Sequence, residues 1–166
     1  MQDVLKSSIL QAIYREAQRS GQPIYCIVDD TIASHTRPSS QAVHPIEAAY
    51  FHQSHLKGCQ DYGHQVVSVM LSCNGITLNY AVILYDKSRS KIQIVQEIAE
   101  ELPAAPVISY FLCDSWYTTA KVMDRFIRKG FYTVGALKTN RILYPCGIRQ
   151  KASAFALHLR KTDPDV

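Results

Sequence analysis

Apolar residues along the chain follow two spacings, which separate the expected helices from the expected strands. Helical spacing covers three segments, residues 3–20, 90–102 and 118–130. Runs rich in β-branched and aromatic residues cover five segments, residues 23–31, 65–73, 76–85, 107–113 and 131–137. Asn74-Gly75 separates the second run from the third and is a strong signal for an antiparallel hairpin.

Two parts of the chain lack a clear period. Residues 32–63 gather Ser, Thr, His, Pro and Gly, which predicts a long loop, and long loops in compact domains are commonly functional. Residues 141–147 suggest a short strand and turn, and residues 151–159 fit either a strand or a helix.

The order of the expected elements indicates the fold class. A strand, a two-stranded hairpin, a helix, a strand, a helix and a strand follow one another, which is the ribonuclease H-like order. We therefore expect an α/β fold, a ribonuclease H-like mixed sheet of five strands flanked by helices. In this sheet the first and fourth strands lie side by side.

Carboxylates follow both of these neighbouring strands. The first run ends on Asp29-Asp30-Thr31 and the fourth on Asp114. Asp30 and Asp114 are then expected to face one another, and such a pair suits Mg²⁺, which takes one or two protein carboxylates and keeps its other positions for water and phosphate. The alternative is that Asp29 and Asp30 only terminate the strand in a turn.

Length and composition favour one globular cytosolic domain. The chain has 166 residues, 47% of them hydrophobic, and no apolar run long enough for a membrane span. The first residues show no basic and apolar signal sequence. Its five cysteines are odd in number and widely spaced, which favours reduced, buried thiols over a disulfide framework.

Charge is distributed unevenly along the chain. Residues 118–166 carry ten Lys or Arg against three Asp, whereas residues 1–117 carry a net charge of −3. An acidic first part and a basic last part would suit a site that holds metal beside a polyanion. A solvated helix face followed by a basic tail explains the same bias.

Several other residues are candidates for binding. His52 and His55 with Cys59 could form a zinc site; the alternative is that they are ordinary loop histidines. Trp116 could stack on a flipped base; the alternative is that it packs the start of the helix onto the sheet. Two further basic residues could contact phosphates, or they could be ordinary solvated charges of a loop: Lys138 and Arg141.

Three stretches resemble the catalytic domain of DDE-type transposases of bacterial insertion sequences: residues 27–31, 63–67 and 112–117. The resemblance covers residues 22–137. It implies metal-dependent DNA cleavage and strand transfer at transposon ends, with Asp30 and Asp114 as the first two acids of the triad and Asp29 as the alternative for the first. Two Mg²⁺ or Mn²⁺ ions are implied, with Asp30 bridging both.

This sequence departs from the family pattern at the third acid. In the family that acid is a glutamate beyond the fifth strand, within a Tyr, Arg, Glu and Lys pattern. After Leu137 the sequence has no glutamate and only the acids Asp163 and Asp165. The exposed face of the helix over 90–102 carries three glutamates, which are poor substitutes: Glu97, Glu100 and Glu101.

The resemblance thus implies a chain truncated before the third acid, or one part of a split enzyme. The expected domains are a packing helix over 1–21, a catalytic core over 22–138 and the start of an incomplete C-terminal segment over 139–166. The implied partners are DNA and either a second copy or a complementing downstream polypeptide, at the bacterial nucleoid. The rival functions are an inactive DNA-binding remnant and another ribonuclease H-like metal-dependent nuclease, so activity of this chain stays open.

Overall fold

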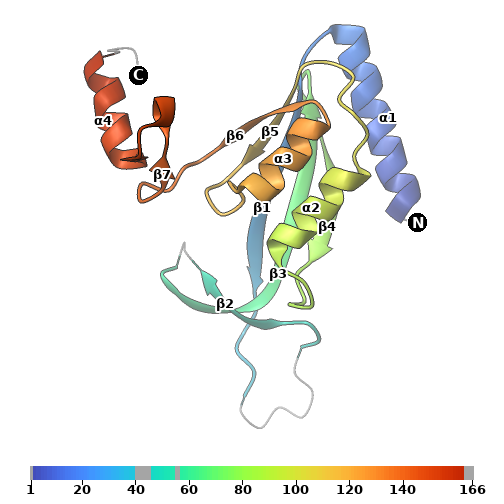
Figure 1. The fold of residues 1–166 in the computed structure, drawn as a ribbon. Coiled ribbons are helices and arrows are strands. Elements are labelled where there is room, and N and C mark those ends of the chain that lie inside the picture. Colours follow the sequence, from blue (N-terminus) through green and yellow to red (C-terminus); the bar gives the residue numbers. More distant parts are fainter. Residues whose placement is uncertain (1, 40–45, 55–56, 163–166) are drawn as a thin grey trace.

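The computed structural model describes residues 2–39, 46–54 and 57–162 (Figure 1). The helices are α1 (Gln2–Ser20), α2 (Lys91–Glu101), α3 (Ala120–Arg128) and α4 (Ala152–Thr162), with one 3₁₀ turn, η1 (Pro145–Gly147). The strands are β1 (Ile24–Ser34), β2 (Tyr50–Ser54), β3 (Cys59–Cys73), β4 (Ile76–Leu84), β5 (Ser109–Cys113), β6 (Phe131–Gly135), β7 (Ile142–Leu143) and β8 (Gln150–Lys151).

The main sheet is mixed and has six strands. Its order is β2-β3-β1-β5-β6, and β4 also pairs with β3. β1 is antiparallel to β3 and parallel to β5, which in turn is parallel to β6. The α/β ribonuclease H-like arrangement is therefore confirmed, with β1 beside the strand expected fourth, and with six strands in place of the expected five.

The extra strand lies in the segment expected to be a loop. β1 continues to Ser34, β3 begins at Cys59, and β2 pairs antiparallel with the first residues of β3. Gly63, one of the residues that suggested a loop, lies where β1 and β3 approach closely. A Cβ at this position would lie 2.1 Å from the carbonyl oxygen of Ala33. This glycine is required for the close approach of β1 and β3, and it does not mark a loop.

The hairpin prediction is confirmed. β3 and β4 pair antiparallel from Cys73 and Ile76 outward. Asn74 and Gly75 both have positive φ, 47° and 80°, as a type I′ turn requires.

One face of the sheet packs against the helices. Even-numbered residues of β1, such as Cys26 and Val28, are buried with alternate residues of β3 and with side chains of α1, α2 and α3. The rings of Phe111 and Phe126 stack at 3.7 Å between β5 and α3. Burial of this apolar surface is the main term that stabilises the sheet and the three helices together.

The opposite face carries a row of tyrosines across three strands. The rings of Tyr25 and Tyr110 are 5.6 Å apart, and those of Tyr110 and Tyr132 are 5.7 Å apart. Tyr132 is 63% exposed and the neighbouring Val134 55%. Aromatic side chains on this face are therefore open to solvent.

The last segment forms a small unit beside the sheet. Figure 1 shows α4 and β7 lying apart from the main sheet, beyond the end of β6. β7 pairs with β8, and residues 152–162 form a helix, which settles the ambiguity in the sequence pattern. The proposed boundary at residues 138–139 remains a prediction.

Two further expectations can be compared with the fold. None of the helices in the described ranges is both long and apolar enough to span a lipid bilayer. All five cysteines are free, but only Cys26 and Cys73 are buried. The expectation of buried thiols was wrong for Cys59 and Cys146, which are exposed.

Candidate active site

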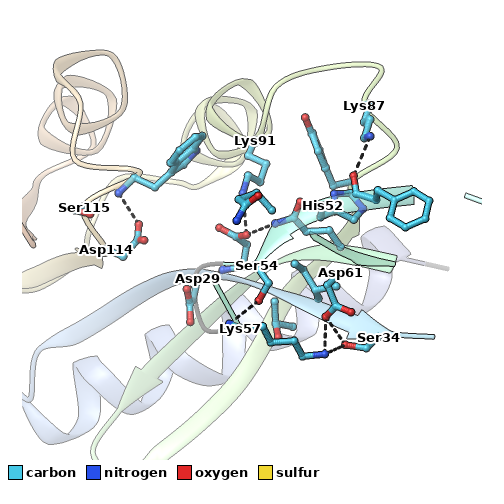
Figure 2. A pocket seen from close by; sticks show the side chains of 18 of the residues that line it. Asp29, Ser34, His52, Ser54, Lys57, Asp61, Lys87, Lys91, Asp114 and Ser115 are labelled. Atoms are coloured by element: carbon cyan, nitrogen blue, oxygen red, sulfur yellow. Dashed lines mark hydrogen bonds and ion pairs between the residues drawn. The ribbon is translucent and has the colours of Figure 1, made fainter. Parts of the chain in front are cut away.

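A cleft of about 750 Å³ opens where β1, β2 and the start of α2 meet the loop after β5 (Figure 2). Its lining combines both signs of charge. The acids are Asp29, Asp30, Asp61 and Asp114, and the lysines are Lys57, Lys87, Lys91 and Lys138. The structure therefore brings the three predicted acidic residues into one site, as their order in the chain suggested.

Asp30 reaches the cleft from the middle of β1. The sequence predicted that the strand stops at this residue, but β1 continues to Ser34 because it stays paired with β3. β5 ends at Cys113, which pairs with Val28, so Asp30 lies just beyond the end of its parallel neighbour. The side chain of Asp30 has the same parity along the strand as the buried Val28 and is only 15% exposed.

Both carboxylate oxygens of Asp30 accept hydrogen bonds. Its Oδ2 accepts from Gln65 Nε2 at 2.5 Å and from Lys91 Nζ at 2.8 Å, and its Oδ1 accepts from the Tyr117 hydroxyl at 2.9 Å. Charge-assisted bonds of this kind are shorter and stronger than neutral ones. Three different elements thus hold Asp30 in a fixed orientation.

Tyr117 links the two predicted catalytic acids. Its side chain donates to Asp30, while its backbone N–H donates to Asp114 Oδ1 at 3.2 Å. The residue is fully buried, and burial, followed by the negative charge of Asp30, raises the pKa of its hydroxyl far above the ordinary value. The hydroxyl therefore stays protonated and remains a donor to Asp30.

Asp114 lies in the turn that leaves β5. Its Oδ1 accepts backbone N–H bonds from Trp116 at 2.9 Å and from Tyr117, as in an Asx turn. Thr118 Oγ1 contacts the carbonyls of Asp114 and Ala136 at 2.8 and 2.9 Å, which ties the ends of β5 and β6 together. The helix that follows begins after Thr119, whose side chain makes no capping hydrogen bond to it.

Asp29 has the opposite parity from Asp30 along β1. It is exposed, and its Oδ1 accepts from the backbone N–H of Asp30 at 2.8 Å. The adjacent acids therefore differ, since Asp30 is enclosed by donors while Asp29 faces solvent at the rim of the same cleft.

Trp116 is 45% exposed and lines the cleft, so the alternative that it packs the helix start onto the sheet was wrong. The neighbouring Tyr117 takes that buried position. The ammonium groups of Lys91 and Lys138 lie 5.0 and 5.2 Å from the centre of the Trp116 ring, within cation–π range. Lys138 is thus part of the cleft.

Arg141 does not line the cleft. Its backbone N–H donates to the Lys138 carbonyl, and its own carbonyl accepts from Ala152. The backbone bonds place it in the turn that precedes the β7–β8 unit.

Sequence reasoning missed Lys91, the first residue of α2. Ser90 caps this helix in a capping box with Gln93. A cation at a helix N-terminus is unfavourable for the helix dipole, so a lysine directly after the cap was the available signal that an acid lies nearby. The contribution of β2 was missed as well, because that strand was not expected.

His52 reaches the cleft from β2. It is 6% exposed, and its Nε2 is buried without a hydrogen-bond partner within the described ranges. Burial, then the nearby Lys87, lowers the pKa of the ring, so it is neutral at pH 7. The described residues contain no group of three His, Cys, Asp or Glu suited to a metal ion, and His55 of the zinc alternative lies outside them.

The donor chemistry of the cleft fits a hard divalent cation. Carboxylate oxygens are the ligands that Mg²⁺ prefers, and Asp29 and Asp114 each use only Oδ1 in the hydrogen bonds described above. Asp30 Oδ2 already accepts from Lys91 and Gln65. A cation at Asp30 would therefore compete with the Lys91 ammonium for this carboxylate.

The comparison with protein families agrees with this geometry. A family model described as the transposase DDE domain matches residues 20–162. No match was found to a curated protein or to a solved structure. The matched range contains β1, β5, the cleft and the small unit at the end of the described chain. On this match over most of its length, the chain belongs to the family of transposases with a DDE domain.

Proposed function

We propose that this transposase domain acts in metal-dependent DNA cleavage and strand transfer at transposon ends. Family membership gives the transposase-type function. The observation that supports the finer proposal is that Asp30 on β1 and Asp114 after β5 line one cleft and share Tyr117 as a hydrogen-bond partner. Asp30 and Asp114 are the proposed catalytic residues.

Transposases of this family generally use divalent metal ions. Asp30 and Asp114 would hold two Mg²⁺ or Mn²⁺ ions, with the exposed Asp29 as a further ligand at the rim. Bound metal supplies activation of an oxygen nucleophile and stabilisation of the leaving 3′ oxygen. Tyr117 and Gln65 keep the Asp30 carboxylate oriented through their hydrogen bonds.

The proposed substrate is DNA, bound through its phosphates. Lysines that line the cleft lie between β4 and α2, at the first residue of α2, just before β3 and after β6. Lysine contacts with phosphates position a duplex without reading its sequence. Trp116 offers an exposed ring beside them, on which an unpaired base can stack. We place this activity at the bacterial nucleoid.

The third acidic ligand needs a separate source in this proposal. Asp61 lines the cleft, but Lys57 at 2.8 Å and Ser34 at 2.6 Å already bind its carboxylate. The sequence has no glutamate after Glu101. We propose that a second copy of the chain or a complementing polypeptide supplies the missing carboxylate.

DNA binding without cleavage is the second candidate function. The Lys91 ammonium favours this function, because the ammonium is already bound to Asp30, one of the proposed metal ligands. It predicts salt-sensitive DNA binding that does not depend on Asp30 or Asp114, because phosphate contacts dominate such affinity.

The test is Mn²⁺-dependent nicking of supercoiled plasmid by the chain and by Asp30→Asn and Asp114→Asn. Each variant should lose about a hundredfold or more of the activity, because even changes behind the metal ligands cost 10–100-fold. Asp124→Asn on the exposed side of α3 is the matched control and should cut like the parent.

The outcomes separate the candidate functions. Nicking that persists in Asp30→Asn and Asp114→Asn would contradict the proposed catalytic pair. A parent chain that binds DNA in a salt-dependent way without cutting would support the binding function.

A further inference from the structure

We propose that Lys91 is a positioning residue that competes with the metal ion for Asp30 and passes to a DNA phosphate once metal is bound. The inference rests on the proposed function, in which Asp30 is a metal ligand. It adds an order of events: the Lys91 ammonium is bound to Asp30 before metal binds, is released when metal binds, and then binds substrate.

The ion pair between Lys91 and Asp30 is short and mostly removed from solvent. Lys91 Nζ lies 2.8 Å from Asp30 Oδ2, and each side chain is 15% exposed. The other ion pairs among the described residues each have a partner that is more exposed, such as Lys57 at 52% and Glu101 at 50%. Screening by water and salt is therefore weakest at the Lys91–Asp30 pair.

Asp30 does not need Lys91 to keep its orientation. Tyr117 and Gln65 already donate to its two oxygens. Lys91 contributes positive charge at Oδ2, one of the two Asp30 oxygens that a divalent ion could use. Because an ammonium and a metal ion repel at such short range, occupation of Asp30 by one excludes the other.

Aromatic rings lie within reach of the Lys91 ammonium in the cleft. Besides Asp30, Lys91 Nζ lies 5.0 Å from the Trp116 ring centre and 6.0 Å from that of Tyr85, and Lys138 Nζ lies 5.2 Å from the same Trp116 ring. Aromatic faces attract an ammonium without fixing one geometry. Once displaced, Lys91 can stay beside Trp116 and, with Lys138, bind a phosphate oxygen.

The position of Lys91 on its helix favours the same transfer. Its location directly after the Ser90 cap places it at the N-terminus of α2, where a positive charge is unfavourable and an anion is favourable. Asp30 offsets that cost before metal binds, and a phosphate would do so afterwards.

The first test measures Mn²⁺ binding without DNA, by electron paramagnetic resonance of the free ion. Lys91→Met should bind Mn²⁺ more tightly than the parent, by about 5-fold to 150-fold, the usual range for coupled sites. Lys138→Met is the matched control, since it removes an equal charge from the same Trp116 ring but no bond to Asp30. Its affinity should change by less than about threefold, because rim charges have small effects.

Equal binding by the parent and Lys91→Met, including no binding by either, would overturn the inference. Asp30→Asn separates this failure from failure of the proposed function. If Asp30→Asn loses Mn²⁺ while Lys91→Met gains nothing, Asp30 is a ligand and only the competition is wrong. If Asp30→Asn binds as the parent does, the metal assignment itself fails.

A second measurement needs no variant that could misfold. In the unsubstituted chain, acylation of lysines followed by mass spectrometry should show faster labelling of Lys91 when Mn²⁺ is present. The exposed Lys121 on α3 should be labelled at the same rate in both samples. Unchanged labelling of Lys91 at saturating Mn²⁺ would overturn the displacement.

The transfer to phosphate is tested by DNA affinity with and without Mn²⁺ at constant ionic strength. Mn²⁺ should increase the affinity of the parent for a duplex and leave that of Lys91→Met unchanged, because in the variant no ammonium is released. An equal increase in both proteins would overturn this part of the proposal.

Discussion

At the scale of single residues, the environment of Asp30 distinguishes it from Asp29. The two carboxylates are adjacent in sequence, yet one accepts from Gln65, Lys91 and Tyr117 while the other faces solvent. The alternation of a β-strand produces this difference, because neighbouring side chains point to opposite faces of the sheet. Asp30 is thereby positioned by the protein core, and Asp29 is not.

Tyr117→Phe tests how much that positioning contributes to stability. The ring stays in the core, but the hydroxyl bond to Asp30 is lost, so the free energy of unfolding should fall by about 1.5–3 kcal/mol, as for other bonds to charged groups. Urea denaturation measures the change. Tyr132→Phe, at a tyrosine that is 63% exposed, should be neutral, and an equal loss in both variants would contradict the assignment.

At the scale of elements, the start of α2 determines where Lys91 lies. Ser90 Oγ accepts from Gln93 N at 3.1 Å, and Gln93 Oε1 accepts from Ser90 N at 2.8 Å, which closes a reciprocal cap. The cap defines the first turn of the helix, and with it the direction from which the Lys91 side chain enters the cleft.

Ser90→Ala should lower the free energy of unfolding by about 1 kcal/mol, the usual cost of losing an N-cap side chain. Ser88→Ala is the control, because the Ser88 hydroxyl donates to Asp86 ahead of the helix and its loss should have a smaller effect. Thermal unfolding followed by circular dichroism compares them. A larger loss in Ser88→Ala would show that the preceding loop, and not the cap, stabilises the start of α2.

At the scale of the whole molecule, the sheet with α1, α2 and α3 forms one unit, and β7, β8 and α4 form another beside it (Figure 1). Residues 136–141 between them are exposed throughout. Exposed backbone with few packing contacts is the preferred substrate of proteases.

Limited trypsin digestion of the full chain should therefore cut first after Lys138 or Arg141. The fragment that ends there should resist further digestion, as mass spectrometry of a time course would show. Earlier cleavage after Lys91, whose side chain is 15% exposed, would contradict the division at residues 138–139.

Local signals in the sequence were enough to predict a large part of the fold. Apolar spacing located the three helices of the core and the strands β1, β4, β5 and β6, and Asn74-Gly75 located the hairpin. Asp30 and Asp114 could be paired because the order of the elements places β1 beside β5. Each of these inferences needs only a period, a turn residue or an order along the chain.

The rest of the cleft depends on contacts between parts of the chain that are far apart in sequence. β2, the last residues of β1 and the first residues of β3 are segments without a clear apolar period, and they become strands because they pair with one another. Gly63 allows the backbones of β1 and β3 to approach closely there. The contacts of Lys91 and Tyr117 with Asp30 join residues 61 and 87 positions apart. Such contacts depend on how helices and loops pack on the sheet, which no local pattern of residues encodes.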